Sequence, residues 1–243
     1  MSLEDRVRAA LATVYDPELD EPITALGFVG ACTVSGRGDV DVRLRLPTPQ
    51  CAPNFAYLMA ADARAAVLSL AQVTRVSIVL EDHYTGAEIN AALARGGEFA
   101  DAFPGETEGS LDALRELFQR KALVARQARV CQALLGAGAS HEVVAALRVA
   151  HLPMGGDGLR CRQLRRELGL PCAPDDAALI AGDGSPLTAE DLPTWLRRAR
   201  LVSLSLESNG GLCRSLLHVR YGEPALLGSP VVSAGPDEEE VAA

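Results

Sequence analysis

Residues 40–80 read VDVRLRLPTPQCAPNFAYLMAADARAAVLSLAQVTRVSIVL, and this stretch decides the fold of the first part of the chain. From residue 40 to residue 46 apolar and charged side chains alternate, which is typical of a strand with one buried face. Residues 54–70 follow with helical periodicity, and Pro53 suits the first turn of that helix. Residues 73–80 are rich in β-branched side chains, so they predict a further strand.

The residues before this stretch extend the same pattern toward the N-terminus. Residues 28–34 predict a strand, and the two glycines in residues 35–39 predict the turn of a hairpin with residues 40–46. Residues 3–14 predict a helix, which a long loop over residues 16–27 follows. The order helix, strand, strand, helix, strand predicts an α+β domain over residues 1–90, with a small three-stranded sheet and helices on one face.

The residues after 90 predict a different architecture. Residues 91–151 predict a Gly/Pro-rich linker and then a helical hairpin of residues 110–135 and 140–151. Residues 152–221 predict a small mixed α/β region, with strands at 201–206 and 212–220 joined across Asn209-Gly210. Residues 222–243 carry proline, serine and glutamate and predict a disordered tail.

Composition and charge exclude some classes of partner. The formal net charge of −9 disfavours nucleic acid, and the arginine clusters at 126–129, 160–166 and 197–200 are expected to form solvated helix faces. No stretch approaches the roughly 20 apolar residues that a bilayer crossing needs, and the N-terminus lacks the order of a secretion signal. We therefore expect a cytoplasmic protein without membrane contact, whose six cysteines are thiols.

Cys51 is the residue with the clearest chemical potential. It lies in a proline-punctuated loop, residues 47–53, between a predicted strand and the start of a predicted helix. The positive end of a helix stabilises a thiolate, which is the form that binds iron, zinc or a cluster. The prolines also restrict the loop and so hold the sulfur in place. The alternative is a small buried cysteine that acts only as an apolar core residue.

Other candidate ligands are less specific. Asp16-Pro17-Glu18 is a good turn sequence without any function, but the Asp16 carboxylate could share a metal with Cys51 or accept its proton if the two loops meet. We therefore predict that the Asp16 and Cys51 side chains lie near each other at one edge of the domain. His83 follows the third strand and is a candidate second metal ligand, or else an ordinary hydrogen-bonded histidine.

The remaining cysteines form no CxxC pair, so their spacing supports no preformed zinc or cluster site. Cys161, Cys172 and Cys213 could still coordinate a metal together, or they are incidental thiols. The sequence also lacks the nucleophile elbow, the P-loop, the dinucleotide fingerprint and the HExxH zinc motif. We therefore expect a protein that is not an enzyme; a thiol enzyme with Cys51 as nucleophile and His83 as base is a third alternative.

Two motifs stand in order within the first 90 residues. The first is Asp16-Pro17-Glu18-Leu19 with Ile23, Leu26-Gly27 and Val29, and the second is Thr48 before Cys51-Ala52-Pro53 at a predicted helix start. These motifs resemble the opening motif and the threonine before a Cys-Pro pair of the iron–sulfur cluster assembly family that includes SufT and the PaaD protein of phenylacetate degradation. The match covers residues 3–90; Ala52 departs from the family pattern, and the residues beyond 90 are not part of the usual short domain.

The resemblance implies an α/β domain of this family and a role in delivering iron or iron–sulfur clusters to target proteins. It implies that Cys51 is the reactive cysteine, that Asp16 and Glu18 belong to the acidic opening motif, and that Thr48 and Pro53 flank the cysteine. Cargo would be bound transiently, and the partners would be a client metalloenzyme, a cluster carrier or a second copy of the chain. A metal-free chaperone or interaction module for a metalloenzyme subunit is the alternative.

Two further segments bear on the client. The HYT…IN segment at residues 83–90 and the stretch Phe118-Gln119-Arg120-Lys121-Ala122 resemble extended versions of the family that are associated with di-iron monooxygenases. This resemblance implies that the client is an oxygenase.

Overall fold

The computed structural model describes residues 1–105 and 110–222. The predicted tail, apart from Gly222, lies outside these residues. The N-terminal domain contains these elements in order: α1 (Leu3–Leu11), β1 (Tyr15–Asp16), β2 (Glu21–Pro22), β3 (Val29–Val34), β4 (Asp39–Arg45), α2 (Pro53–Leu68), β5 (Arg75–Glu81), α3 (Gly86–Ala94) and α4 (Phe99–Ala102). A helical arm follows: α5 (Asp112–Gly136), α6 (His141–Ala145), the 3-10 turn η1 (Val149–His151), α7 (Gly156–Glu167) and α8 (Leu192–Tyr221).

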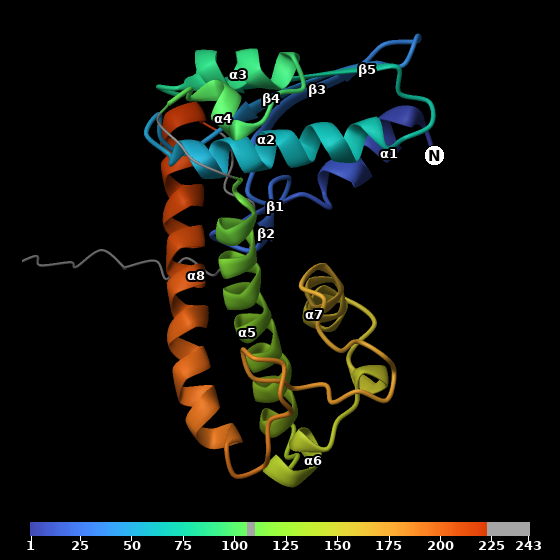
Figure 1. Cartoon of the computed structure of the whole chain (residues 1–243), viewed down its shortest axis with the longest axis vertical. Helices are drawn as coiled ribbons and strands as arrows, with labels where there is room; N and C mark the ends of the chain where they lie inside the picture. The colour runs from blue at the N-terminus through green and yellow to red at the C-terminus, as the bar shows by residue number, and fades with distance from the viewer. Residues whose placement is uncertain (106–109, 223–243) are drawn as a thin grey trace, which may run out of the picture.

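The sheet of the N-terminal domain has the strand order β3-β4-β5, antiparallel between β3 and β4 and parallel between β4 and β5. Along β4, Val40, Val42 and Leu44 are buried while Asp41 and Arg43 are exposed, as the alternation predicts. Helix α1 packs against β3, and α2 packs against β5 (Figure 1). The α+β class and the predicted order of helix, strand, strand, helix, strand are therefore confirmed.

The loop predicted over residues 16–27 contains a small β ladder of its own. β1 and β2 pair antiparallel, with Tyr15 opposite Pro22 and Asp16 opposite Glu21. Between them Asp20 adopts φ +50°, a left-handed conformation that aspartate tolerates better than most residues. We call residues 15–22 the β1–β2 loop. The pairing of β1 with β2 directs the side chains of Asp20 and Glu21 toward the helices of the arm.

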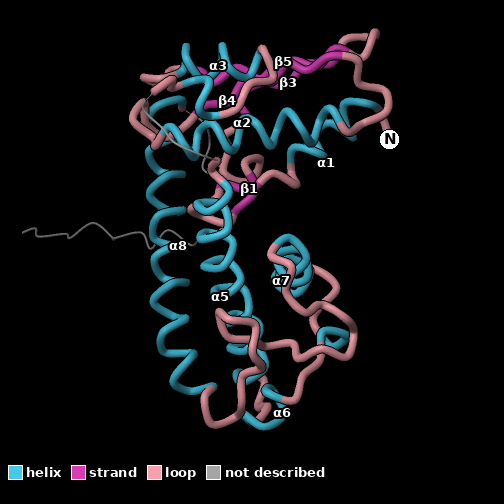
Figure 2. The backbone as a smooth tube through the Cα atoms, in the orientation of Figure 1, coloured by secondary structure: helices cyan, strands magenta, loops and turns pink. Residues whose placement is uncertain are grey.

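The helical arm has its own hydrophobic core, separate from that of the N-terminal domain. Helices α5 and α8 run side by side away from the sheet, and α7 lies on the other side of α5 (Figures 1 and 2). The long helix predicted at residues 110–135 is confirmed as α5, whereas the second helix of the predicted hairpin is broken into α6 and η1. None of the helices in the described ranges combines the length and apolar composition that a bilayer crossing requires.

The mixed α/β region predicted for residues 152–221 is wrong, because the two expected strands are parts of the single helix α8. The residues of α8 that face inward include Ala199, Ser203, Leu206 and Gly210, which recur at helical spacing. Because several of them are small or polar, the Val-Ser-Leu-Ser-Leu pattern of residues 202–206 imitates the alternation of a strand. Gly210 lies within α8 rather than in a turn, and it leaves room for the Glu21 side chain, whose Oε1 would lie 2.7 Å from a Cβ at this position.

A buried ion-pair cluster joins the domain to the arm. The carboxylate of Asp20, only 3% exposed, accepts from Arg126 Nε of α5 at 2.6 Å and from Arg160 Nε of α7 at 2.9 Å. The Arg160 guanidinium also stacks on the Tyr15 ring, 3.9 Å from its centroid. On the other side of the loop, Arg214 of α8 donates to Glu21 at 2.6 Å. Three helices of the arm thus bind one loop of the domain.

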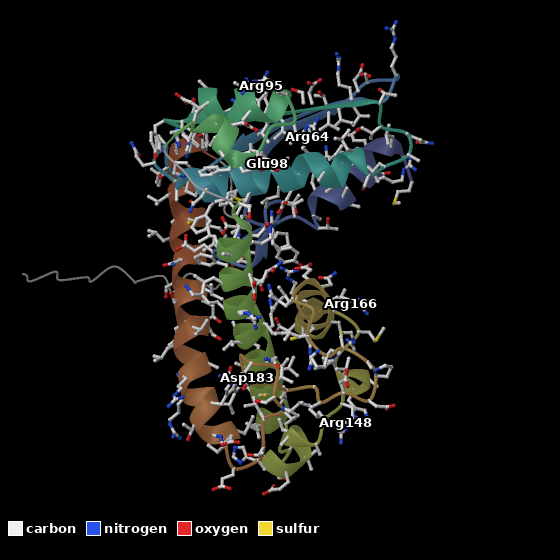
Figure 3. The ribbon with its side chains drawn as sticks, in the orientation of Figure 1. Arg64, Arg95, Glu98, Arg148, Arg166 and Asp183 are labelled. Atoms are coloured by element: carbon white, nitrogen blue, oxygen red, sulfur yellow. The ribbon has the colours of Figure 1, made fainter. Side chains whose placement is uncertain are left out.

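The arginines of α7 are not the solvated face that their clustering predicts. Arg162 and Arg165 are buried and donate to backbone carbonyls of the irregular segments that flank α7, including those of Val149, Leu152 and Ala177. Carbonyls in irregular segments have no ladder partners, so buried guanidinium groups satisfy them. Arg166, by contrast, is exposed on the outer side of α7 (Figure 3).

The Asp20 cluster predicts a large and specific loss of stability for Asp20→Asn. Asparagine tolerates the same backbone conformation, but it removes the charge that compensates Arg126 and Arg160. We expect the free energy of unfolding in urea to fall by about 3 to 5 kcal/mol, as when one member of a buried pair is removed. Glu4→Gln is the control, because its exposed pair with Arg8 should contribute only about 0.5 kcal/mol. Equal losses in the two variants would contradict this assignment.

Candidate functional site

Cys51 lies where the sequence predicts it, in the loop between β4 and α2. It comes one residue before Ala52, the N-cap of α2, and Pro53 occupies the first turn of that helix. Its side chain is half-buried, and Thr48 Oγ1 lies 3.5 Å from Cys51 Sγ. The backbone of the loop bends back on itself, since Cys51 N–H donates to Thr48 O at 3.4 Å. The sulfur is thus held at the positive end of a helix, near a hydroxyl group.

His83 supports this loop through its backbone. Its Nε2 lies 2.7 Å from Cys51 O, and because a carbonyl can only accept, Nε2 carries the hydrogen. Nδ1 in turn accepts from the backbone N–H of Thr85 at 3.3 Å. Burial lowers the pKa of His83, and the Arg220 charge lowers it further. The hydrogen bond to Cys51 O raises this pKa but does not outweigh them. To ligate a metal, His83 would have to give up its hydrogen bond to Cys51 O or the one from Thr85 N–H. Both ring nitrogens bind backbone groups rather than the Cys51 sulfur, which a general base would contact.

Asp16 is buried within its own turn. Its Oδ1 accepts from the backbone N–H groups of Glu18 at 2.8 Å and Leu19 at 2.9 Å, the arrangement of an Asx turn. Burial raises the pKa of Asp16 to about 6, and the charges of Glu18 and Glu21 add to that increase while the backbone bonds oppose it. This carboxyl therefore changes its protonation just below neutral pH.

Cys213 of α8 is the functional candidate that local sequence reasoning did not place here. Burial raises the pKa of its thiol to about 11, and the charges of Asp16, Cys51 and Glu18 raise it further. Both cysteines pack against the core of the N-terminal domain. Asp16 and Cys51 thus both act electrostatically on Cys213, a thiol contributed by a residue more than a hundred positions away in the sequence. Within the described residues, no hydrogen bond joins these three side chains to one another.

The metal site considered for Cys161, Cys172 and Cys213 is not formed. Cys161 is fully buried in the core of the arm, and Cys172 packs against that same core. Burial raises the pKa of Cys161 to about 12, so it stays a neutral thiol. The helical path of α8 carries Cys213 to the other core instead. The spacing of the cysteines in the sequence could not have shown that Cys213 lies apart from Cys161 and Cys172, because the location of Cys213 depends on where α8 ends.

The last turn of α8 is bound to both strand ends that flank the Cys51 loop. Arg220 donates to Leu46 O at 3.2 Å, just after β4, and to Asp82 O at 2.8 Å, just after β5. Tyr221 donates to the Asp82 carboxylate at 3.2 Å. Leu217 lies so close to Gly27 that a Cβ there would be 3.1 Å from its methyl group. The arm thus covers part of the Cys51 site, and Arg220 binds the strand ends that flank the Cys51 loop.

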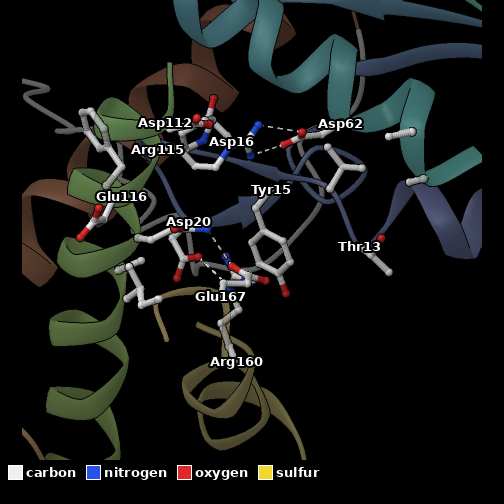
Figure 4. Close-up of a pocket in the computed structure, with 18 residues that line it drawn as sticks. Thr13, Tyr15, Asp16, Asp20, Asp62, Asp112, Arg115, Glu116, Arg160 and Glu167 are labelled. Carbon is white, nitrogen blue, oxygen red and sulfur yellow. Dashed lines mark hydrogen bonds and ion pairs between the residues drawn. The ribbon is translucent and has the colours of Figure 1, made fainter. Parts of the chain in front are cut away.

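A cleft of about 670 Å³ opens between the domain and the arm, beside Asp16 (Figure 4). Two ion pairs span it from opposite sides: Arg115 binds Asp62 through two bonds of 2.6 and 2.8 Å, and Arg160 binds Asp20. The lining arginines are thus already paired. The further carboxylates on its walls, Asp112, Glu116 and Glu167, leave the lining predominantly acidic.

The side chains of the described residues do not form a preformed metal site. Within residues 1–105 and 110–222, no group of three or more His, Cys, Asp and Glu side chains is arranged to hold a metal ion. Clusters usually need four ligands, so the described side chains around Cys51 do not form a complete cluster site.

Comparison with known proteins identifies the family of the N-terminal domain. The family model described as iron–sulfur cluster assembly protein matches residues 4–78. The uncharacterized protein MJ1129 of Methanocaldococcus jannaschii is 33% identical over 93 residues, which is 38% of this chain and 96% of that protein. No solved structure matches the chain. The chain therefore belongs to the iron–sulfur cluster assembly protein family through its N-terminal domain, and α5 to α8 lie outside the residues matched by the family model.

The buried Asp16 carboxyl predicts a pH-dependent cost in stability. The folded state holds the Asp16 proton more tightly than the unfolded chain does, so the cost appears as pH rises from about 4 through 6. Asp16→Asn keeps the acceptor of the turn and removes this ionisation. Its free energy of unfolding in urea, relative to wild type, should rise by roughly 2 to 3 kcal/mol between pH 4 and pH 7. A difference that stays constant with pH would refute the raised pKa.

Proposed function

We propose that this protein is a non-enzymatic assembly factor that holds iron or an iron–sulfur cluster at Cys51 and passes it to a client metalloenzyme. Family membership supports the general role in iron–sulfur cluster assembly. The observation that carries the specific proposal is the position of the half-buried Cys51 at the positive end of α2, with Cys213 of α8 packed against the same core. In this proposal the iron or the cluster is cargo, not a resident cofactor.

The chemistry of the site supports transfer rather than storage. Cys51 is the proposed first sulfur for cargo, and Cys213 is a second sulfur that would have to lose its proton before it could bind iron. Asp16, with a pKa of about 6, is a nearby group that could accept such a proton. Because these residues do not complete four ligands, a carrier, the client or a second copy must supply the others. Each such exchange partner offers a route by which cargo leaves.

The proposed partners are a client metalloenzyme and a cluster carrier, and the proposed location is the cytoplasm. An oxygenase is the proposed client, and the resemblance of residues 83–90 and 118–122 to versions associated with di-iron monooxygenases supports it. The net charge of −9 argues against a nucleic-acid partner. The arm is the proposed client-recognition element, because it lies outside the residues matched by the family model.

A metal-free chaperone is the second candidate function. The observation that favours it is that the described residues form no group of three or more metal ligands. In this case the long arm would hold a metalloenzyme subunit in a metal-receptive state, and Cys51 would only support the loop. The two candidates differ in whether the Cys51 sulfur is required.

Anaerobic reconstitution with ferrous iron and sulfide separates the two candidates. After desalting, we expect wild type to retain iron, acid-labile sulfide and visible absorption, and we expect Cys51→Ala to lose most of all three. Cys32→Ser is the matched control, because Cys32 is a half-buried thiol on β3 of the same domain. It should retain cargo as wild type does, since replacing it leaves the Cys51 neighbourhood intact.

A further variant tests the contribution of the arm. Cys213→Ala should retain less cargo than wild type but more than Cys51→Ala, because it removes the secondary sulfur only. Equal cargo retention by wild type and Cys51→Ala would overturn the proposed role of Cys51. If Cys51→Ala also supported client activation as well as wild type does, the chaperone function would be the correct one.

A further inference from the structure

Strand β5 is an outer strand of the sheet, and part of its free edge lines a groove. The strand order β3-β4-β5 leaves one side of β5 without a neighbouring strand. A groove of about 630 Å³ follows this side from Thr74 to Val79. Its other walls come from α2, with Arg64 and Leu68, and from α3, with Asn90, Ala91, Leu93 and Ala94. We call this surface the β5 groove.

The backbone of β5 is paired at one end of its free edge and open along the rest. The Asn90 side chain donates to Leu80 O at 3.0 Å and accepts from Leu80 N–H at 2.8 Å, so it takes the place of a neighbouring strand there. The register with β4 is regular along all of β5. Because the backbone groups of alternate residues point to the same side, those of Val76 and Ile78 also point away from β4. Among the described residues, no turn or loop backbone supplies a partner for these groups.

The β5 groove is a basic surface on an acidic protein. The formal net charge is −9, yet no aspartate or glutamate lines the groove. Arg64 is half-buried on its α2 wall (Figure 3), and within residues 1–105 and 110–222 it makes no ion pair or hydrogen bond. Arg75, at the start of β5, is 75% exposed and lies 3.5 Å from Asp39. A guanidinium without a partner on a groove wall favours a ligand that carries a carboxylate.

We propose that the β5 groove binds an extended segment of a partner protein, which adds a strand beside β5 and places an acidic side chain against Arg64. Main-chain hydrogen bonds to Val76 and Ile78 supply affinity, and alternate side chains of the segment supply specificity. Leu68, which is 38% exposed on the α2 wall, offers an apolar contact to one of these side chains. The edge from residue 74 to residue 79 is roughly 17 Å long, so it accommodates about six extended residues.

The walls of the groove favour a single extended segment over a second sheet edge. Helices α2 and α3 both contact β5 and contact each other, so the open edge is recessed between them. A second copy could offer its own β5 only together with the same two helices and the same arginines. Open edges are usually protected by charged residues or proline, whereas residues 76–79 are Val-Ser-Ile-Val. This proposal does not depend on the cargo proposed for Cys51.

Fluorescence anisotropy of the full chain with a labelled peptide, GSDVTVTVG with an amidated C-terminus, tests the groove through Arg64. The probe combines one carboxylate with strand-forming residues. We expect saturable binding by wild type and a dissociation constant raised on the order of tenfold for Arg64→Glu, because attraction becomes repulsion. Arginine and glutamate have similar helix propensities, so far-UV circular dichroism should not change. Arg95→Glu is the matched control, because it reverses the charge of an exposed arginine outside the groove lining.

Two modified probes test the charge contact and the added strand separately. The peptide GSKVTVTVG should bind Arg64→Glu more tightly than wild type, a reversal that misfolding of the variant cannot produce. N-methylation of alternate amides of the first probe should abolish its binding to wild type, because it removes the donors that face β5. Hydrogen exchange at the Val76 and Ile78 amides should slow when the unmodified probe binds.

Failure of the full chain to bind the probe, or equal binding by wild type and Arg64→Glu, would overturn the proposal. Binding only by a chain that ends at Gly222 would also overturn it, because residues 223–243 would then be the occupant. So would protection of the Val76 and Ile78 amides that rises with protein concentration in the absence of probe, since the occupant would then be a second copy. Arg64→Glu should retain iron and sulfide as wild type does, so this test is distinct from that of Cys51.

Discussion

The buried carboxylate of Asp20 is the interaction on which the architecture depends. It is 3% exposed, and it receives one guanidinium from α5 and another from α7. Arg126 also donates to the Asp20 backbone carbonyl and binds Asp157 of α7 at 2.9 Å, so the cluster fixes a backbone position as well as a charge. A buried ion pair contributes little net stability over an apolar pair, but its loss leaves uncompensated charge. Its main effect is therefore to specify one relative placement of domain and arm.

That placement determines the composition of the candidate site. The acidic opening motif of the family lies in the β1–β2 loop, so the contacts that bind the arm also surround Asp16. With α5 and α7 held in place, α8 returns along the domain and brings Cys213 and Arg220 to the Cys51 loop. The site thus combines residues inside and outside the stretch that the family model matches. An isolated domain of residues 1–90 would contain Cys51 and Asp16 but neither the second thiol nor the support from Arg220.

The two sides of α8 divide its roles. Toward the domain and α5 it presents small residues such as Ala199, Ser203 and Gly210, which allow close approach. Away from them it presents leucines and a valine that the fold leaves uncovered. This inversion of the usual amphipathic arrangement follows from the packing partners, because a helix that approaches a neighbour closely cannot place large side chains there. The same inversion explains why its sequence imitates two strands.

The sequence by itself determined the elements whose buried face is apolar: the alternation along β4, the helical period of α2 and the rigid loop that presents Cys51. It also identified Asp16 and Cys51 as candidate site residues. Only the tertiary structure decided that α8 is one helix, that Arg162 and Arg165 are buried, and that Cys213 joins the site. The physical reason is that periodicity reports burial only where hydrophobicity and burial coincide. Small residues, carbonyl-bound arginines and contacts between distant segments carry no such local signal.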